Sequence, residues 1–166
     1  MGAPGPSRQR QADLALAVIR PARPAEAGRL TEIAFAAKAV WGYSPSFMAR
    51  CRAALAVDAA DILPRLFHLA EVADGAVLGF YGFEPEPGGI GLSHLFVTPA
   101  AIGRGVGRAL WDHAVAEARR LEAARLIVVS DPNATGFYLR MGAEPAGGRL
   151  SEVEPERVLP VFRLRL

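Results

Sequence analysis

The spacing of apolar residues near the start of the chain predicts one strand followed by two helices. An apolar run at residues 14–19 ends at an Arg-Pro pair, as a first strand would, and residues 24–39 carry apolar side chains at helical spacing. Ser44 then stands in an N-cap position, with Pro45 as the first residue of a helix that continues to about residue 55. The break between the two helices is surrounded by Trp41, Tyr43 and Phe47.

The middle of the chain predicts a hairpin and then a further strand. Residues 66–72 and 76–83 are largely apolar runs on either side of an Asp-Gly turn, a pattern typical of two antiparallel strands. We expect residues 85–91, which are rich in Pro and Gly, to close this hairpin, and residues 92–97 to form the next strand.

The second half predicts a long helix between two strands and a short helix after them. Residues 98–105 form a loop that contains glycines, and residues 106–122 carry an apolar stripe that would pack on a sheet. Residues 126–129 are apolar, as in a strand covered on both faces, and residues 134–141 form a short helix that Gly142 ends. The stripe of the long helix consists of Val106, Leu110, Ala114 and Ala118, widened by Trp111, Val115 and Leu121.

The last segment and the order of the elements indicate the fold class. Residues 159–166 alternate, with Phe162, Leu164 and Leu166 on one side and arginines on the other, which predicts a half-exposed strand. Because a hairpin precedes a strand, helix and strand crossover, the sheet must be mixed, and we expect one α/β domain. This domain would span residues 13–166, after a disordered leader at residues 1–12.

Composition and charge exclude several other classes of protein. Apolar residues make up 51% of the 166 residues, and no run approaches the ~18 apolar residues of a membrane span. The first ten residues lack the apolar core of a secretory signal, so we expect a soluble, cytoplasmic protein with no membrane partner. The 19 Lys and Arg residues face 17 Asp and Glu residues and are scattered, which argues against a nucleic-acid partner. Cys51, the single cysteine, has no neighbouring Cys or His pair, so we expect it to pack within its helix and to bind no metal.

The most informative segment is the loop with alternating glycines, which a strand enters and a helix leaves. Gly103, Gly105 and Gly107 would let backbone N–H groups approach an anion closely, and the helix N-terminus adds the positive end of its dipole. Arg104 and Arg108 add positive charge. The segment is therefore suited to a phosphate or a pyrophosphate.

Spacing separates the phosphate loops that could be present. The Walker A pattern needs Gly-Lys followed by Ser or Thr, which the chain lacks, and the dinucleotide fingerprint would place Arg108 or Leu110 where a glycine is required. The segment resembles the coenzyme A pyrophosphate loop of GNAT acetyltransferases, in which a strand ends in Val-x-Pro and a Gln or Arg precedes the glycines. Ile102, Gly105 and Gly107 take the signature positions, and Ile102 replaces the usual Gln or Arg, so one side-chain donor is lost.

A second segment, residues 131–143, resembles the other GNAT signature, Asn-x-x-Ala-x-x-Phe-Tyr-x-x-x-Gly-Phe. Asp131 stands where Asn is usual, and Asn133 could supply the hydrogen bond to the coenzyme instead. Ala143 replaces the final Phe. With both signatures in order, the resemblance covers most of the chain, although the N-terminal half resembles the family only in the order of its elements.

The resemblance implies a single-domain GNAT-like fold, a mixed sheet of about six to seven strands flanked by about four helices, with splayed central strands. It also implies acetyl-coenzyme A as cosubstrate and no metal. The pantetheine arm would pair with the backbone of the strand that precedes the glycine loop. The residues implied to bind the cosubstrate are Leu95, Phe96, Val97, Ile102, Gly103, Arg104, Gly105, Val106, Gly107, Arg108, Asp131, Asn133 and Tyr138.

The reaction that the resemblance implies is direct attack of a neutral amine on the acetyl thioester. The oxyanion must be held and the leaving thiolate protonated. Tyr138 matches the general acid of the family, and the alternative is an aromatic ring packed in the core. His94 is a candidate for the base, directly or through water, and the alternative is a hydrogen-bonded core histidine. Strand periodicity would place His94 on one face with Leu92 and Phe96.

Two carboxylates are further candidates for the base. Glu71 and Glu84 lie on or beside the hairpin, where either could accept a proton or simply be solvated at the surface.

The sequence thus favours an N-acetyltransferase that moves an acetyl group to a primary amine on a small molecule, a peptide or a protein. One alternative is a catalytically idle acyl-coenzyme A-binding domain that acts as a sensor or interaction module, and a weaker one is a basic nucleic-acid binder. A homodimer stays open. In the family the region of Trp41, Tyr43 and Phe47 covers the acceptor pocket, so these aromatics form either a lid or a corner of the core.

Overall fold

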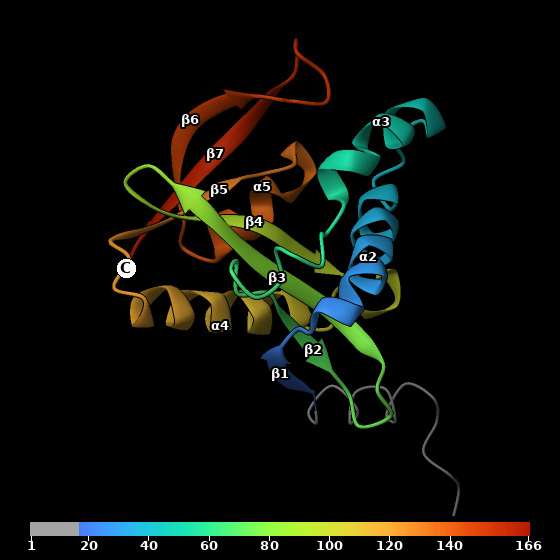
Figure 1. Ribbon diagram of the computed structural model, residues 1–166. Coiled ribbons are helices and arrows are strands. Elements are labelled where there is room, and N and C mark those ends of the chain that lie inside the picture. Colours follow the sequence, from blue (N-terminus) through green and yellow to red (C-terminus); the bar gives the residue numbers. More distant parts are fainter. Residues whose placement is uncertain (1–16) are drawn as a thin grey trace, which may run out of the picture.

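The computed structural model describes residues 17–166, which fold into a seven-stranded sheet with helices on both faces (Figure 1). The expected leader at residues 1–12 lies outside the described residues. The strand order is β1-β2-β3-β4-β5-β7-β6, and neighbours are antiparallel except β4 and β5, which are parallel, so the predicted mixed sheet is confirmed. The strands are β1 (Val18–Pro21), β2 (His68–Glu71), β3 (Val77–Glu86), β4 (Gly89–Val97), β5 (Arg125–Val129), β6 (Glu144–Leu150) and β7 (Val158–Arg165), and the α-helices are α2 (Ala27–Ala39), α3 (Pro45–Leu55), α4 (Val106–Arg120) and α5 (Thr135–Arg140).

The first elements lie close to the predicted positions. A 3₁₀ turn, η1 (Pro24–Glu26), leads into α2, and the Ser44 side chain accepts a hydrogen bond from the Phe47 amide at 3.2 Å, so Ser44 caps α3 as predicted. Strand β1 begins at Val18 and extends past the predicted end of the strand, because the Arg-Pro pair continues the pairing with β2. The predicted strand residues before position 17 lie outside the described residues. Pro21 is tolerated there since β1 is an edge strand.

Residues 85–91 belong mostly to two paired strands, which corrects the prediction that they only close the first hairpin. Pro85 of β3 lies opposite Ile90 of β4, and the turn falls between them. Strand β2 is shorter than predicted and does not reach this part of β3, so no neighbour needs the N–H that Pro85 lacks.

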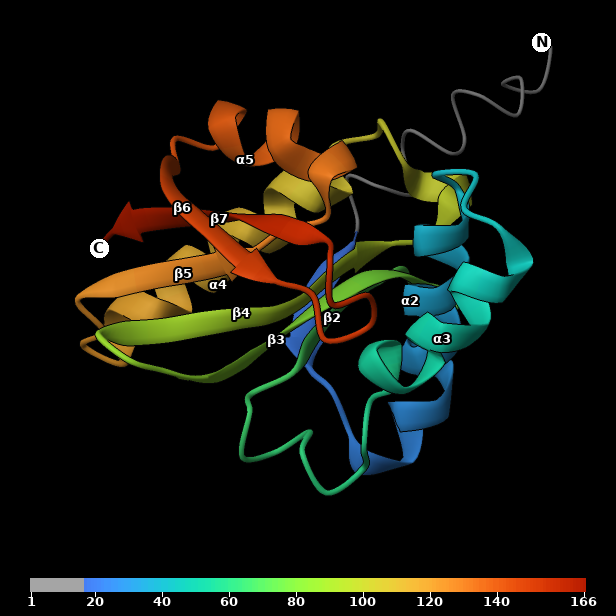
Figure 2. The same ribbon diagram turned by 90° about the horizontal axis from the view of Figure 1, so that it is seen from above.

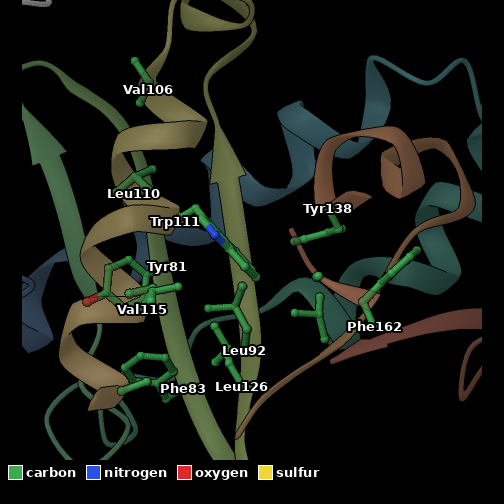
Figure 3. Close-up of a cluster of buried hydrophobic side chains, with 14 of the residues drawn as sticks. Tyr81, Phe83, Leu92, Val106, Leu110, Trp111, Val115, Leu126, Tyr138 and Phe162 are labelled. Atoms are coloured by element: carbon green, nitrogen blue, oxygen red, sulfur yellow. The ribbon is translucent and has the colours of Figure 1, made fainter. Parts of the chain in front are cut away.

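Helix α4 covers one face of the sheet with the stripe that its sequence predicts. Leu110, Trp111 and Val115 are buried and point toward the strands (Figure 3). Leu121 does not widen the stripe as predicted, because the helix ends at Arg120 and the Leu121 side chain is 39% exposed.

No strand is predicted from the sequence at Glu144–Leu150, where β6 forms the edge of the sheet beside β7. All of its residues are exposed and it contains a Gly-Gly pair, so it shows neither alternation nor a β-branched run. Backbone pairing with β7 holds this strand, and a hydrophobic pattern does not record such pairing.

Each face of the sheet carries its own hydrophobic cluster, with α4 and α5 on one side and α2 and α3 on the other (Figure 2). Leu110, Trp111, Tyr138 and Phe162 belong to the first cluster, and Leu30, Phe47, Phe67 and Phe80 belong to the second. The sheet therefore separates two hydrophobic cores, and a site that contacts both cores must lie among its strands.

The central strands β4 and β5 pair at one end only. Ile90 and Gly91 are the residues of β4 that have partners in β5, and β4 continues to Val97 without one. At the paired end, a Cβ on Gly89 would lie 2.3 Å from the Arg125 carbonyl oxygen, so a glycine is needed for this close approach. The splayed central strands predicted from the family resemblance are thus present.

We expect Gly89→Ala to destabilise the protein by about 1–3 kcal/mol, because the added methyl would push β4 away from β5 at their paired end. The matched control is Gly28→Ala in α2, where nothing lies within 4 Å of the new methyl. That variant should gain up to about 1 kcal/mol from helix propensity. Urea unfolding measures both changes, and equal stability of the two variants would contradict the prediction.

Candidate functional site

A cavity of about 770 Å³ occupies the opening between β4 and β5. Its lining comes from β4, from the loop before α4, from α5, and from α2 and α3 on the opposite side. Segments far apart in the sequence meet here because the two strands diverge. A cavity of this size can enclose a drug-sized ligand.

The free edge of β4 forms one wall of the cavity. Leu95, Phe96 and Val97 pair with β3 on one side and have no described partner strand on the side of β5. All three residues line the cavity. Backbone N–H and C=O groups along such an edge can hydrogen-bond an extended ligand as a further strand would.

The glycine loop closes another part of the cavity with an open backbone cradle. Gly103 and Gly105 have φ angles of 74° and 87°, and nothing lies within 4 Å of the place where a Cβ would stand. Both line the cavity with Ile102, and Gly105 is the N-cap of the 15-residue α4. The free amides of the first turn of α4 face this loop, so the residues present fit an anionic phosphate group.

The remaining loop residues predicted to bind the cosubstrate do not all line the cavity. Arg108 lines the cavity, whereas Arg104 is not part of its lining, and the Val106 side chain is buried in the core. Gly107 borders the cavity, but a Cβ there would lie 3.4 Å from the Phe137 ring. Its small size therefore serves the contact between α4 and α5.

Tyr138 is both a core aromatic and a cavity residue, so the two alternatives weighed for it coexist. Its ring is 7% exposed and packs against Trp111 and Phe162, as Figure 3 shows, with ring centroids 5.6 and 5.8 Å away. Burial raises the pKa of the Tyr138 phenol well above its usual range, so the group keeps its proton at neutral pH. Its hydroxyl has no hydrogen-bond partner within residues 17–166, and the residue lines the cavity, which leaves that proton available.

His94 shares a face of β4 with Phe96, as predicted, but Leu92 lies on the opposite face, which corrects that part of the assignment. A register shift beside Gly82 disturbs the alternation, so Leu92 joins the cluster under α4 while the His94 ring lies among Phe67 and Phe80. Its Nδ1 lies 3.0 Å from the Ser93 hydroxyl, and its buried Nε2 has no hydrogen-bond partner in the described structure.

The environment of His94 makes it a weak base. Burial, helped by the charge of Arg65, lowers its pKa to about 4. The imidazole is therefore neutral at physiological pH, and its protonated form is unfavourable, although the residue lines the cavity.

The two carboxylates considered for the base lie outside the cavity lining. Glu71 pairs with Arg20 at 2.8 Å on the far side of the sheet, where hydrogen bonding lowers the pKa of the carboxyl. Glu84 is half-buried on β3, and burial raises its pKa.

Asp131 belongs to a polar network that joins α2 to the β5–α5 loop across the cavity. The carboxylate accepts a hydrogen bond from Lys38 Nζ at 2.7 Å, one from the Tyr43 hydroxyl at 2.9 Å and one from the Asn133 amide at 2.9 Å. Burial by itself would raise the pKa of Asp131, but these donors outweigh it and lower the pKa below its usual value. Asp131 and Asn133 both line the cavity, and the Asn133 side-chain nitrogen donates to the Tyr43 hydroxyl and to the Asp131 carboxylate.

Arg157 completes this network. The sequence did not point to either of the network's two cations, Lys38 and Arg157, as a site residue. The Arg157 guanidinium donates to the Tyr43 hydroxyl at 2.5 Å and lies 3.8 Å from Asp131. Lys38 and Arg157 also lie over the rings of Tyr43 and Phe47, at 5.0 to 5.7 Å from the ring centroids. The available signal was Lys38, the only lysine in the chain, which composition alone does not connect to a site.

The aromatic residues between α2 and α3 divide between the two roles considered for them. Trp41 is 48% exposed at the cavity, Phe47 is buried in its wall, and Tyr43 organises the polar network behind it. Cys51 is buried in α3, as predicted, and burial raises the pKa of its thiol.

Within residues 17–166, no cluster of His, Cys, Asp and Glu side chains could hold a metal ion. In the same part of the chain, no helix combines the length and the apolar character that crossing a bilayer requires.

The family model of the acetyltransferase (GNAT) domain matches residues 54–152. This match includes β4, the glycine loop, α4 and α5, and so most of the cavity wall. No curated protein matches the chain.

Many solved structures share the fold. A GCN5-related N-acetyltransferase from Rhodopseudomonas palustris has a TM-score of 0.77 at 24% identity, over 92% of this chain and 98% of that one. A GNAT family acetyltransferase from Brucella melitensis, solved with acetyl-coenzyme A, has a TM-score of 0.60 at 25% identity, over 90% and 87% of the two chains. An N-acetyltransferase from Thermoplasma acidophilum, solved with coenzyme A, has a TM-score of 0.67 at 16% identity, over 90% and 99%. The seven-stranded sheet with its four helices is GNAT-like.

The depressed pKa of His94 predicts a loss of stability in mild acid. The folded pKa is about 4 and the unfolded pKa is about 6.5, so the unfolded state binds the proton more readily and stability falls as the pH drops through this window. Between pH 7 and pH 5 the loss should be about 2 kcal/mol. Urea unfolding of the native protein and of His94→Gln at both pH values measures it. Other titrating groups contribute equally to both proteins, so parallel pH profiles would contradict the assigned pKa.

Proposed function

Because the chain belongs to the GNAT acetyltransferase domain family, we propose that it transfers an acetyl group from acetyl-coenzyme A to a primary amine by direct attack. The observation that carries this proposal is the free edge of β4, which meets the glycine cradle within one cavity. An extended pantetheine arm needs the first feature and a pyrophosphate needs the second.

The cosubstrate would be held mainly by the backbone of this chain. Leu95 to Val97 would pair with the pantetheine amides, and the amides around Gly103 and Gly105 would bind the pyrophosphate. Ile102 offers no polar side chain there, so backbone donors and the charge of Arg108 carry the binding.

Tyr138 is suited to protonate the leaving thiolate, because burial keeps its hydroxyl protonated and that hydroxyl is not committed to another residue in the described structure. His94 is the imidazole in the cavity wall, and we assign it the proton relay from the amine through water. Its low pKa makes this step weak, so the amine must be largely neutral when it attacks.

Thiol release with a panel of primary amines tests the function. Release of coenzyme A that depends on both the amine and the protein supports the proposal. Tight binding of acetyl-coenzyme A without release on any amine would favour an acyl-coenzyme A-binding module instead.

We expect Gly105→Val to abolish coenzyme A binding, because its side chain would project into the open cradle. Valine is strained at a φ of 87°, so the matched control is Gly75→Val, at a φ of 84° in the β2–β3 turn outside the cavity lining. Calorimetric titration should show affinity lost in the first variant and kept in the second. Equal affinity in both would mean that the loop does not bind the coenzyme.

Tyr138→Phe keeps the ring packed against Trp111 and Phe162 and removes only the hydroxyl. Turnover should fall by about 10²-fold or more with little change in the dissociation constant of acetyl-coenzyme A, since general acid catalysis typically contributes that much. Steady-state kinetics with an accepted amine, beside calorimetry, separates the two quantities. Unchanged turnover would return Tyr138 to a packing role.

A further inference from the structure

The charges on the cavity wall are strongly unequal. Among residues 17–166, the charged residues that line it are four cations, Lys38, Arg108, Arg140 and Arg157, and one carboxylate, Asp131. Arg108 follows the glycine loop and Arg140 lies on α5, on the side assigned to the cosubstrate. Lys38 and Arg157 lie apart from them, toward α2 and α3, where the acceptor would enter.

Lys38 and Arg157 are only partly neutralised. Asp131 is 2.7 Å from Lys38 and 3.8 Å from Arg157, so one carboxylate faces two cations and one positive charge remains. Their side chains are 15% and 19% exposed, which weakens solvent screening.

Both cations keep hydrogen-bond donors in reserve. Within residues 17–166, Lys38 donates to Asp131 and Arg157 donates through one Nη to Tyr43, and no other hydrogen bond engages either group. Arginine has five N–H donors and lysine has three, so most of them remain available at the cavity wall. A carboxylate is one of the anionic groups that such donors bind through charge-assisted hydrogen bonds.

Two of the aromatic rings at this end are not available to a cationic acceptor. The rings of Tyr43 and Phe47 already carry Lys38 and Arg157 over them. The only lining carboxylate in the described structure is the one that these cations hold. A polyamine would therefore meet like charges and no free anion.

We propose that the acceptor is an aminocarboxylate, a primary amine that carries a carboxylate and an apolar body, with the carboxylate bound by Arg157 and Lys38. This inference rests on the proposed acetyl transfer and names its substrate class. A single remaining positive charge matches a monoanion, and Trp41, Phe47 and Leu159 supply apolar wall for the rest of the molecule.

The test compares each acceptor with its uncharged counterpart. Phenylalanine, methionine and leucine are titrated calorimetrically, beside their three amides, into the protein loaded with coenzyme A. We expect at least one amino acid to bind 10-fold or more tightly than its amide. Amides that bind as well as or better than all three amino acids, or no detectable binding of any amino acid, would overturn the inference.

Variants assign the discrimination to the proposed residue. In Arg157→Gln the ratio of the two affinities should fall toward one, while coenzyme A binding stays unchanged. The matched control is Arg50→Gln, which removes an arginine that also lies over Phe47 but pairs with Glu154 outside the cavity lining. A ratio that persists in Arg157→Gln, or falls equally in Arg50→Gln, would contradict the assignment, because a merely structural role would weaken both ligands alike.

Thiol release from acetyl-coenzyme A, measured with the same amino acids and amides, keeps the two proposals apart. An amino acid that binds selectively but yields no thiol would refute acetyl transfer and leave the carboxylate site in place. Thiol release with the amides alone would support acetyl transfer and refute the carboxylate site.

Discussion

The parting of β4 from β5 is the constraint on which the rest of the site depends. Pairing over Ile90 and Gly91 leaves the remainder of β4 with backbone groups that no neighbouring strand satisfies. Unpaired N–H and C=O groups are costly once water is excluded, so an edge of this kind inside a sheet persists only where it opens to solvent or to a ligand. The helices hold the sheet together around this opening, because the helices on each face pack on the hydrophobic cluster of that face.

How much the sequence could predict differs between the fold and the site. Helix α4 and the α3 cap are local features, recorded in a periodic stripe and in a Ser-Pro pair, and both were predicted. Strand β6 was missed because its residues are all exposed and its pairing with β7 leaves no hydrophobic pattern. Leu92 was wrongly placed on the face of His94 and Phe96, because a register shift between two strands is a tertiary feature that strict alternation cannot express.

The glycine loop was found from the sequence because its chemistry is local, whereas the network around Asp131 was not. Lys38, Asp131 and Arg157 are separated by 93 and 26 positions, and each alone is an ordinary charged residue. Even the departure from the family pattern at Asp131 was interpreted only as a change in a coenzyme contact. Its partner Lys38 gives that change a structural reason, since an asparagine could not compensate the cation as a carboxylate does.

The protonation states of the cavity residues link the network around Asp131 to the proposed acetyl transfer. His94 cannot hold a proton near neutral pH, and the one lining carboxylate in the described residues is bound by Lys38, so the described cavity wall offers no strong base to an incoming ammonium. Tyr138, by contrast, keeps its proton through burial, and in the proposed reaction it would donate that proton to the thiolate. In the proposed reaction the amine must therefore be largely neutral when it attacks, and the buried phenol is the proton source beside the leaving group.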